Sequence, residues 1–279
     1  MKLITWNVQW CRGVDDKVDP ARIIKTARAM ADFDVLCLQE VAVNFPGLAG
    51  SRGEDQVAEL STGLPGFSAH YGAATDVDDG KGGRSLFGNL ILSRLPVVQV
   101  YRHLLPRPAD PGVKSMQRIA VEAVVQAPWG PVRVVTTHLE YYSATQRMAQ
   151  VEALHALHRE ACGQAAVTRI QDDAGQPFHA RPRPTSAILT GDFNFQPQGA
   201  EYRRMTQPAG ASFVDAWTLA HRAEPHAPTA GVHENSWAKQ PYCCDFVFLT
   251  ADLASRVREV KIDLHTQASD HQPVLLSVS

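Results

Sequence analysis

Polar side chains able to bind metal ions or to move protons follow several short apolar runs of the sequence. Near the C-terminus, Ser269-Asp270-His271 precedes the apolar run Val274-Leu275-Leu276. Such runs are typical of buried strands, so each polar cluster is expected at the mouth or the end of a strand. The other clusters are Thr5-Trp6-Asn7, Gln39-Glu40, Thr137-His138, Gly191-Asp192-Phe193-Asn194 and Asp245. Gathered at one edge, these groups favour metal-dependent phosphoester chemistry.

Phosphate chemistry sets requirements that these residue types meet. A phosphodiester resists hydrolysis because its anionic oxygens repel nucleophiles, so a site must neutralise charge, activate water and stabilise the departing oxygen. Hard oxygen ligands select Mg²⁺ or Mn²⁺ rather than zinc. Glu40 is the first candidate ligand, followed by Asp270 and Asn7. We therefore expect Mg²⁺ as the cofactor, with Mn²⁺ as the alternative ion.

Two further pairs of residues have positions that suggest roles. Asp192 and Asn194 lie two apart on a segment expected to be extended, so they would project to the same side and hold the attacking water between them. Asp192 would accept the proton of that water or act at the leaving group. Asp270 and His271 are adjacent and would point to opposite faces of a strand, so both reach one site only if the chain turns there.

The ordered set of motifs resembles the endonuclease/exonuclease/phosphatase superfamily over nearly the whole chain. Besides the clusters above, it includes Leu38 before Gln39-Glu40, and Gly88-Asn89 before Ile91-Leu92-Ser93-Arg94. That superfamily contains deoxyribonuclease I, apurinic/apyrimidinic endonucleases, neutral sphingomyelinases and inositol polyphosphate 5-phosphatases. The resemblance implies a four-layered α/β sandwich, in which two packed, mostly antiparallel β-sheets are flanked by helices and the site lies at one open edge.

The resemblance also implies roles for individual residues. His271 would pair with the carboxylate of Asp245, which would fix its tautomer and favour its charged form. This pair would either take a proton from water or stabilise the phosphorane-like transition state. His138 would reach the phosphate from the opposite side, with Asn89 orienting His138 and Arg118 contacting the phosphate.

Departures from the family pattern leave the substrate open. Cys243-Cys244-Asp245-Phe246 replaces the common Arg-Ile-Asp-Tyr stretch, and the basic residues of the 5-phosphatase signature are missing after Asn194. The leading interpretation is a phosphodiester hydrolase that uses activated water and acts on DNA, RNA or a nucleotide. The alternative is a lipid or small-molecule phosphoesterase, like a sphingomyelinase or a phosphatase. A third interpretation, an inactive binding module, predicts loss of a central site residue, and none is missing.

Charge and length constrain the partners and the cellular setting. Lys and Arg total 27 against 29 Asp and Glu, so the chain has no overall basic field to hold a long polyanion. The candidate site residues span Asn7 to His271, which favours one domain over residues 1–279. No stretch reaches the roughly 18 apolar residues of a membrane span. A first strand that starts almost at once leaves no room for an export signal, so we expect a cytoplasmic protein. We expect no stable membrane association, and we favour a monomer.

The apolar patterns predict many strands and fewer helices. A helix is expected from Asp19-Pro20 through Met30, and another after Ser143, whose spacing to Gln146 forms a capping box. Five long connections, at about 42–56, 74–87, 104–117, 163–185 and 217–241, would form the rim of the site. The strands are expected at about 2–8, 34–41, 68–74, 88–94, 97–104, 118–127, 131–139, 186–192, 212–216, 243–249, 257–263 and 273–278.

Overall fold

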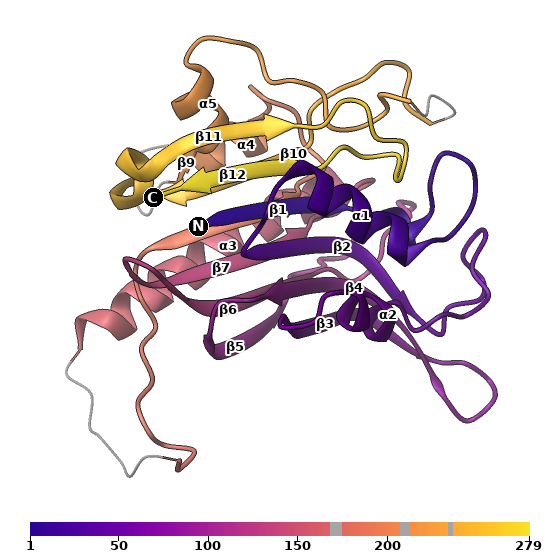
Figure 1. Ribbon diagram of the computed structural model, residues 1–279, viewed down its shortest axis with the longest axis horizontal. Coiled ribbons are helices and arrows are strands. Elements are labelled where there is room, and N and C mark those ends of the chain that lie inside the picture. Colours follow the sequence, from indigo (N-terminus) through magenta and orange to yellow (C-terminus); the bar gives the residue numbers. More distant parts are fainter. Residues whose placement is uncertain (168–174, 207–212, 234–236) are drawn as a thin grey trace.

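Two six-stranded β-sheets pack face to face in the computed structural model, which describes residues 1–167, 175–206, 213–233 and 237–279 (Figure 1). The first sheet has the order β11 (Val257–Ile262), β12 (Val274–Val278), β1 (Lys2–Asn7), β2 (Val35–Val43), β4 (Arg84–Ser93) and β3 (Ser68–Asp78). The second has the order β5 (Val97–Leu104), β6 (Ile119–Ala127), β7 (Gly130–His138), β8 (Ala187–Asp192), β10 (Asp245–Thr250) and β9 (Phe213–Asp215).

One parallel pair lies at the centre of each sheet, and all the other neighbours are antiparallel. In the first sheet β1 pairs with β2, which places Asn7 beside Gln39. In the second sheet β7 pairs with β8, which places His138 beside Asp192. Parallel strands end at the same edge, so each central pair delivers two polar strand ends to one place. The expected mostly antiparallel, two-sheet architecture is confirmed.

Alternation along the strands divides the side chains between the inner core and the outer layers. Leu3, Val35 and Cys37 face the second sheet and pack with residues such as Val134 and Ile188. At the edge near the polar strand ends, polar contacts replace this apolar packing. The fully buried amide of Gln39 donates to Thr5 Oγ1 at 3.1 Å and, across the interface between the sheets, to Thr136 Oγ1 at 2.8 Å. Gln39 thus fixes the spacing of the two sheets beside the strand ends.

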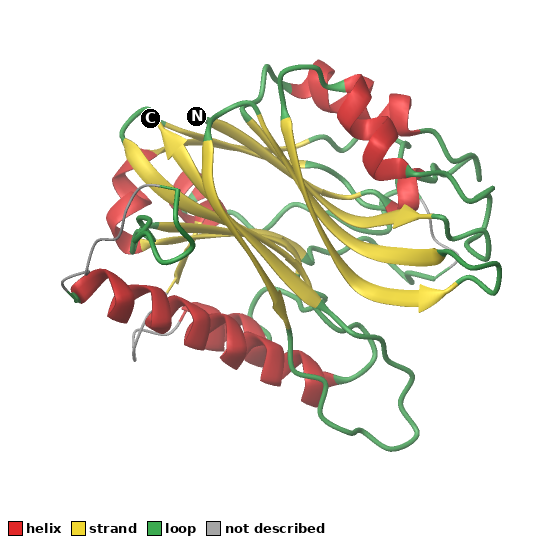
Figure 2. Ribbon diagram, turned by 90° about the horizontal axis from the view of Figure 1, so that it is seen from below, coloured by secondary structure: helices red, strands yellow, loops and turns green. Residues whose placement is uncertain are grey.

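Helices cover the outer faces of both sheets, which completes the four layers (Figure 2). The expected caps are present: Asp19 accepts from the Arg22 amide at the start of α1, and Ser143 accepts from the Gln146 amide at the start of α3. No helix in the described ranges is both long and apolar enough to cross a membrane. The helices are α1 (Pro20–Met30), α2 (Gln56–Gly63), α3 (Ala144–Ala166), α4 (Ala200–Thr206) and α5 (Ala216–His221), with short 3₁₀ helices at Gln9–Cys11 and Ala251–Arg256.

The structure corrects one of the long connections expected at the rim. The segment 74–87 is not a long loop, because β3 continues to Asp78 and β4 begins at Arg84. The hairpin arms are joined by an ion pair in which Arg84 Nε donates to Asp76 Oδ1 at 2.7 Å. Much of β3 is exposed or only partly buried, so it lacks the apolar alternation that marks a strand. The helices α2, α4 and α5 were not predicted either, since each is short.

Candidate active site

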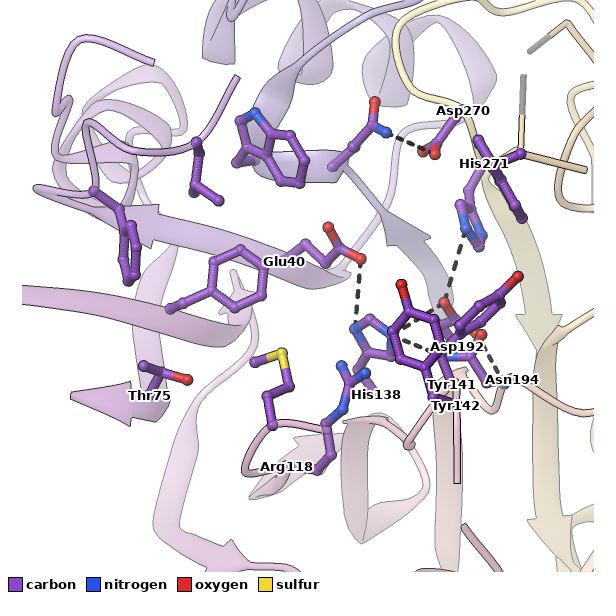
Figure 3. Close-up of a pocket in the computed structure, with 17 residues that line it drawn as sticks. Glu40, Thr75, Arg118, His138, Tyr141, Tyr142, Asp192, Asn194, Asp270 and His271 are labelled. Atoms are coloured by element: carbon purple, nitrogen blue, oxygen red, sulfur yellow. Dashed lines mark hydrogen bonds and ion pairs between the residues drawn. The ribbon is translucent and has the colours of Figure 1, made fainter. Parts of the chain in front are cut away.

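A pocket of about 680 Å³ opens at the edge where the central parallel pairs end (Figure 3). Most of the predicted site residues line it: Glu40, Arg118, His138, Asp192, Asn194, Asp270 and His271. Asn7 donates a hydrogen bond to Glu40, and Asp245 contacts His271. Asn89 does not line the pocket. The remaining wall consists of Gln9, Trp10, Phe45, Leu48, Thr75, Phe87, Met116, Tyr141, Tyr142 and Trp237.

A β-bulge turns Glu40 into the pocket. The pairing register between β2 and β4 shifts between Leu38 and Val41, and Glu40 has a φ of 60°. A bulge bends its strand and re-aims a side chain, so Glu40 leaves the alternation that keeps Gln39 between the sheets. The chain after Asn7 is also left-handed, with φ of 46° at Gln9 and 44° at Trp10. This turn lets the Gln9 amide donate to Asn7 Oδ1 at 3.1 Å.

Three carboxylates converge on the floor of the pocket. The amide of Asn7 donates to Glu40 Oε1 and to Asp192 Oδ2, both at 3.0 Å, and Gln9 Nε2 donates to Asp270 Oδ2 at 2.7 Å. Burial, reinforced by the charge of Asp270, raises the pKa of Glu40 to about 7. Burial and the charge of Asp245 raise the pKa of Asp192 to about 6, and burial also raises that of Asp270. Within the described part of the chain, no lysine or arginine forms an ion pair with Glu40 or Asp270. Lysine and arginine side chains of the described residues therefore do not neutralise Glu40 and Asp270.

His271 and Asp245 form a buried pair beside these carboxylates. His271 Nδ1 lies 2.9 Å from Asp245 Oδ2, and His271 Nε2 lies 3.8 Å from Asp192 Oδ2. Burial alone would lower the pKa of His271, but the charges of Asp245 and Asp192 hold it well above the usual range. The backbone is fixed as well, since the Trp6 indole donates to the His271 carbonyl at 2.9 Å. His271 is therefore a charged imidazolium at neutral pH.

The segment after β8 places Asp192, Asn194 and His138 in mutual contact. Gly191 packs so closely on β7 that an added Cβ would lie 1.9 Å from the Thr137 carbonyl oxygen, so only glycine fits. Asn194 does not continue the strand, because its φ of 51° makes a turn in which its amide N–H donates to Asp192 Oδ1 at 2.9 Å. The expected same-side placement of Asp192 and Asn194 thus comes from a turn and not from an extended chain.

His138 is held by Asn194, whose Nδ2 lies 2.9 Å from His138 Nε2. Burial, followed by the charges of Arg118 and His271, lowers the pKa of His138 well below its usual value. Its approaches to Asp192 Oδ2 at 3.3 Å and to Glu40 Oε1 at 3.8 Å therefore involve a neutral ring.

Asn89 and Arg118 make contacts that the sequence did not predict. Asn89 was expected to orient His138, but its amide donates to the Ile119 carbonyl at 2.9 Å, and Asn194 makes the contact with His138 instead. Arg118 does reach the pocket wall, but it is also paired with the fully buried Glu140 at 3.2 Å. Arg118 is thus held in place by Glu140 before any ligand is present.

Several residues of the site were not predicted. Gln9 bonds to Asp270, and Thr229 Oγ1 accepts from the backbone amide of Asp245 at 3.0 Å. Glu140 anchors Arg118 and also accepts from the Tyr142 amide at 3.0 Å. The position of Gln9 two residues after Asn7 is a signal that the sequence does offer. Thr229 and Glu140 lie in connections without periodicity, and no motif marks them.

Two sets of side chains could hold a metal ion. One consists of the carboxylates of Glu40 and Asp270, which line the pocket, together with Asn7, whose side-chain nitrogen donates to Glu40 and whose oxygen accepts from the Gln9 amide. The other is Asp192, Cys244 and His271, whose ligand atoms lie within 4.8 Å of one another. Burial and the charge of Asp192 raise the pKa of the Cys244 thiol far above its usual value, and His271 is charged, so both would have to lose protons to bind an ion. A hard cation fits the oxygen set better.

Comparisons with known proteins agree with this geometry. The model of the Endonuclease/Exonuclease/phosphatase family matches residues 4–271. An endonuclease/exonuclease/phosphatase from Beutenbergia cavernae DSM 12333 is 25% identical with a TM-score of 0.69, covering 100% of this chain and 72% of that chain. A mannosyl-6-phosphatase from Bacteroides thetaiotaomicron VPI-5482 is 16% identical with a TM-score of 0.69, covering 100% and 99%. A 3′ phosphatase from Neisseria, solved with a product DNA hairpin, is 20% identical with a TM-score of 0.64, covering 100% and 99%.

No curated protein sequence matches the chain significantly. Members of the matched family are hydrolases that act on phosphoesters and generally use divalent metal ions. The family model spans nearly the whole sequence, and the two-sheet sandwich is the fold of the solved family members. The chain therefore belongs to the endonuclease/exonuclease/phosphatase family.

Proposed function

We propose that the protein is a divalent-metal-dependent phosphodiester hydrolase that uses water as the nucleophile and acts on a nucleic acid or a nucleotide. The observation that carries this proposal is the meeting of three groups in one pocket. These are the carboxylates of Glu40 and Asp270, the pair Asp192 and Asn194, and the charged His271. Each meets one requirement of phosphodiester hydrolysis: neutralised charge, activated water and a stabilised transition state.

Glu40, Asp270 and Asn7 are the residues that would hold the metal ion. Burial raises the pKa of both carboxyl groups, and the charge of His271 offsets this rise only in part. Mg²⁺ typically takes one or two carboxylates and keeps several waters, and Mn²⁺ accepts the same oxygen ligands. When bound, such an ion neutralises phosphate charge and acts as a Lewis acid on the phosphoryl group.

Asp192 is suited to accept the proton of the attacking water. A pKa of about 6 lies close to neutral pH, where a general base combines availability with sufficient basicity. The turn at Asn194 fixes Asp192 Oδ1, while Oδ2 remains directed toward Asn7 and the two histidines. A water held near Oδ2 would therefore face the centre of the pocket.

Positive charge and hydrogen-bond donors on the remaining walls suit the phosphoryl oxygens. His271 supplies an imidazolium, and Arg118 supplies a guanidinium that Glu140 already holds. The neutral ring of His138 lines the same pocket, with its Nδ1 atom 3.8 Å from Glu40 Oε1. These donors are fixed before substrate arrives, which is the condition under which they stabilise developing charge most effectively.

A lipid or small-molecule phosphoester is the second candidate substrate. One side of the pocket is apolar, with Trp10, Phe45, Leu48 and Phe87. Similar structures include both a mannosyl-6-phosphatase and a 3′ phosphatase bound to DNA. The nucleic acid is preferred because the hollow next to the pocket combines aromatic rings, those of Tyr141, Tyr142 and Trp237, with the cations Arg147 and Lys239.

The first test compares a model diester with a model monoester. We expect hydrolysis of bis(p-nitrophenyl) phosphate with Mg²⁺ or Mn²⁺, little hydrolysis of p-nitrophenyl phosphate, and no turnover in EDTA. The rate of p-nitrophenol release, with an enzyme-free sample as the blank, measures all three. Turnover that persists in EDTA would contradict the metal, and preference for the monoester would indicate a phosphatase.

The metal site makes a separate prediction about stability. The pKa of Glu40 is raised from 4.5 to about 7. The contribution of Glu40 to the free energy of unfolding is therefore fully present below pH 4.5 and is lost as the pH rises through about 7. Above that pH the metal-free protein should carry a cost of about 3 kcal/mol, which Glu40→Gln removes. In EDTA at pH 8, we therefore expect the variant to be more stable than the wild type in urea unfolding, and the two to converge near pH 4.5.

Mg²⁺ should reverse this order, because it stabilises the wild type and not the variant. Glu59→Gln is the matched control, since Glu59 is an exposed residue of α2. A Glu40→Gln protein that is no more stable than the wild type in EDTA at pH 8 would rule out a charge-deficient site at Glu40.

A further inference from the structure

A second hollow, which we call the aromatic groove, adjoins the active-site pocket. It measures about 730 Å³ and shares four lining residues with that pocket. The shared residues are Tyr141, Tyr142, Asn194 and Trp237. Figure 3 shows Tyr141 and Tyr142 beside Asn194 and far from Thr75 on the other side of the pocket. The groove therefore begins at the reacting centre and extends away on the side of Asn194.

The charge of the groove differs from that of the pocket. The pocket contains the carboxylates of Glu40, Asp192 and Asp270, whereas none of the described residues that line the groove is an aspartate or a glutamate. The groove has Arg147 and Lys239 instead. Arg147 donates to Glu201 and to the carbonyls of Glu140 and Tyr141, so it shapes the wall. Lys239 is exposed and offers its charge to a ligand. Lys239 therefore offers a countercharge to an anionic group that extends from the scissile phosphate into the groove.

Aromatic rings form the part of the groove nearest the reacting centre. Tyr141, Tyr142 and Trp237 are 42%, 55% and 36% exposed, which is unusual for side chains of this size. Trp237 lies nearly parallel to the ring of His271, with centroids 6.0 Å apart and an interplanar angle of 18°. Tyr141 and Tyr142 meet edge to face. Exposed ring faces of this kind stack on nucleobases.

Amide side chains lie among the rings and the cations. Gln196 and Gln240 line the groove together with the hydroxyl-bearing Tyr242. Amides can both donate and accept hydrogen bonds, as the edges of nucleobases require. A lipid chain would need a continuous apolar wall, and this lining lacks one. The apolar wall of Trp10, Phe45, Leu48 and Phe87 lies in the pocket and not in the groove.

We propose that the aromatic groove binds the nucleotide that flanks the scissile phosphate in a single-stranded nucleic acid. Its base stacks on Trp237, and its next phosphate lies near Lys239. The strand thus runs from the reacting centre to one side only, toward Lys239. This proposal rests on the function proposed above and names the substrate class of the same site.

The test separates binding in the groove from the chemistry. Binding of a fluorescein-labelled single-stranded DNA of ten nucleotides is measured by anisotropy in EDTA, where the reaction is not required. We expect Trp237→Ala to weaken binding about tenfold, as for the loss of one stacked base. Lys239→Ala should lower the slope of log Kd against log salt by about 0.7, the value for one phosphate contact of a single strand. Phe178→Ala and Lys261→Ala, which alter exposed residues outside both hollows, should leave both quantities unchanged.

Kinetics with metal give the second measurement. Trp237→Ala should raise KM for the oligonucleotide about tenfold more than KM for bis(p-nitrophenyl) phosphate. Equal losses on both substrates would overturn the proposal, because Trp237 would then act through His271. Oligonucleotide binding that neither Trp237→Ala nor Lys239→Ala weakens would overturn it as well. So would groove variants that lose binding to phosphatidylcholine vesicles and keep binding to the oligonucleotide. If the wild type bound the oligonucleotide through the groove but hydrolysed no diester, the result would support the groove and contradict the proposed function.

Discussion

Replacing Asp192 by asparagine should lower kcat for a phosphodiester by about 10³-fold, within the range of general-base contributions. Asparagine keeps the size of the side chain and an oxygen for the Asn194 amide, which donates to Asp192 Oδ1 at 2.9 Å. It removes the group whose pKa of about 6 allows it to take a proton near neutral pH. Steady-state kinetics on bis(p-nitrophenyl) phosphate measure the loss, and the thermal midpoint checks the fold.

The pH profile separates this role from a structural one. Wild-type activity should rise with pH through about 6, as Asp192 loses its proton, and the residual activity of the variant should lack that rise. Asp32→Asn is the control, since that side chain is 84% exposed and pairs with Arg94 on the surface. A variant within tenfold of the wild type, or one that keeps the same rise, would remove Asp192 from the role of base.

The sequence predicts the strands well because most of them are buried and carry regular patterns. Runs such as Val35-Leu36-Cys37-Leu38 face the two cores on alternate residues, and the structure places them as expected. The outer half of β3 was not predicted, because it is exposed and has no regular apolar pattern. Helix α1 was found from its cap, since Asp19 and Pro20 act locally. Local signals were thus sufficient wherever burial or capping was local.

The site could be predicted as a set of residues but not as a geometry. Glu40 enters the pocket through a bulge, and a bulge depends on pairing between β2 and β4, which are about fifty residues apart in the chain. Asn89 carries a motif but bonds to Ile119 in the other sheet, a contact that no local pattern reveals. Trp237, Tyr141 and Tyr142 lie in connections without periodicity. Residues in strand ends or within a few positions of them were therefore predictable, while those in the middle of loops were not.

Asp245→Asn should reveal whether the charge of His271 is used in the reaction. Burial favours the neutral ring, and the charges of Asp245 and Asp192 overcome it, so loss of the Asp245 charge should lower the pKa of His271. At pH 8 we expect kcat to fall about 10²-fold, the loss typical of one fixed charge or donor at a transition state. The ratio of wild-type to variant kcat should narrow as the pH falls toward 6, because the variant regains the imidazolium.

Stability should change with pH in the opposite direction. The folded-state pKa of His271 is raised above 6.5, so its contribution is fully present below pH 6.5 and is lost as the pH rises through the folded-state value. The stability difference between wild type and Asp245→Asn should therefore be largest at low pH, where the difference in kcat is smallest. Urea unfolding and kinetics on the same samples measure the two trends.

The pair of Asp215 with His226, 2.6 Å apart and outside the active-site pocket, provides the matched control. Asp215→Asn removes the charge from a similar buried pair and keeps an oxygen for the cap of α5, so it should cost stability through the pair. It should leave kcat within about threefold of the wild type, since it removes no donor or charge at the transition state. If Asp245→Asn behaved like Asp215→Asn, the His271–Asp245 pair would be structural, and the positive charge in the pocket would have to come from Arg118 and the metal ion alone.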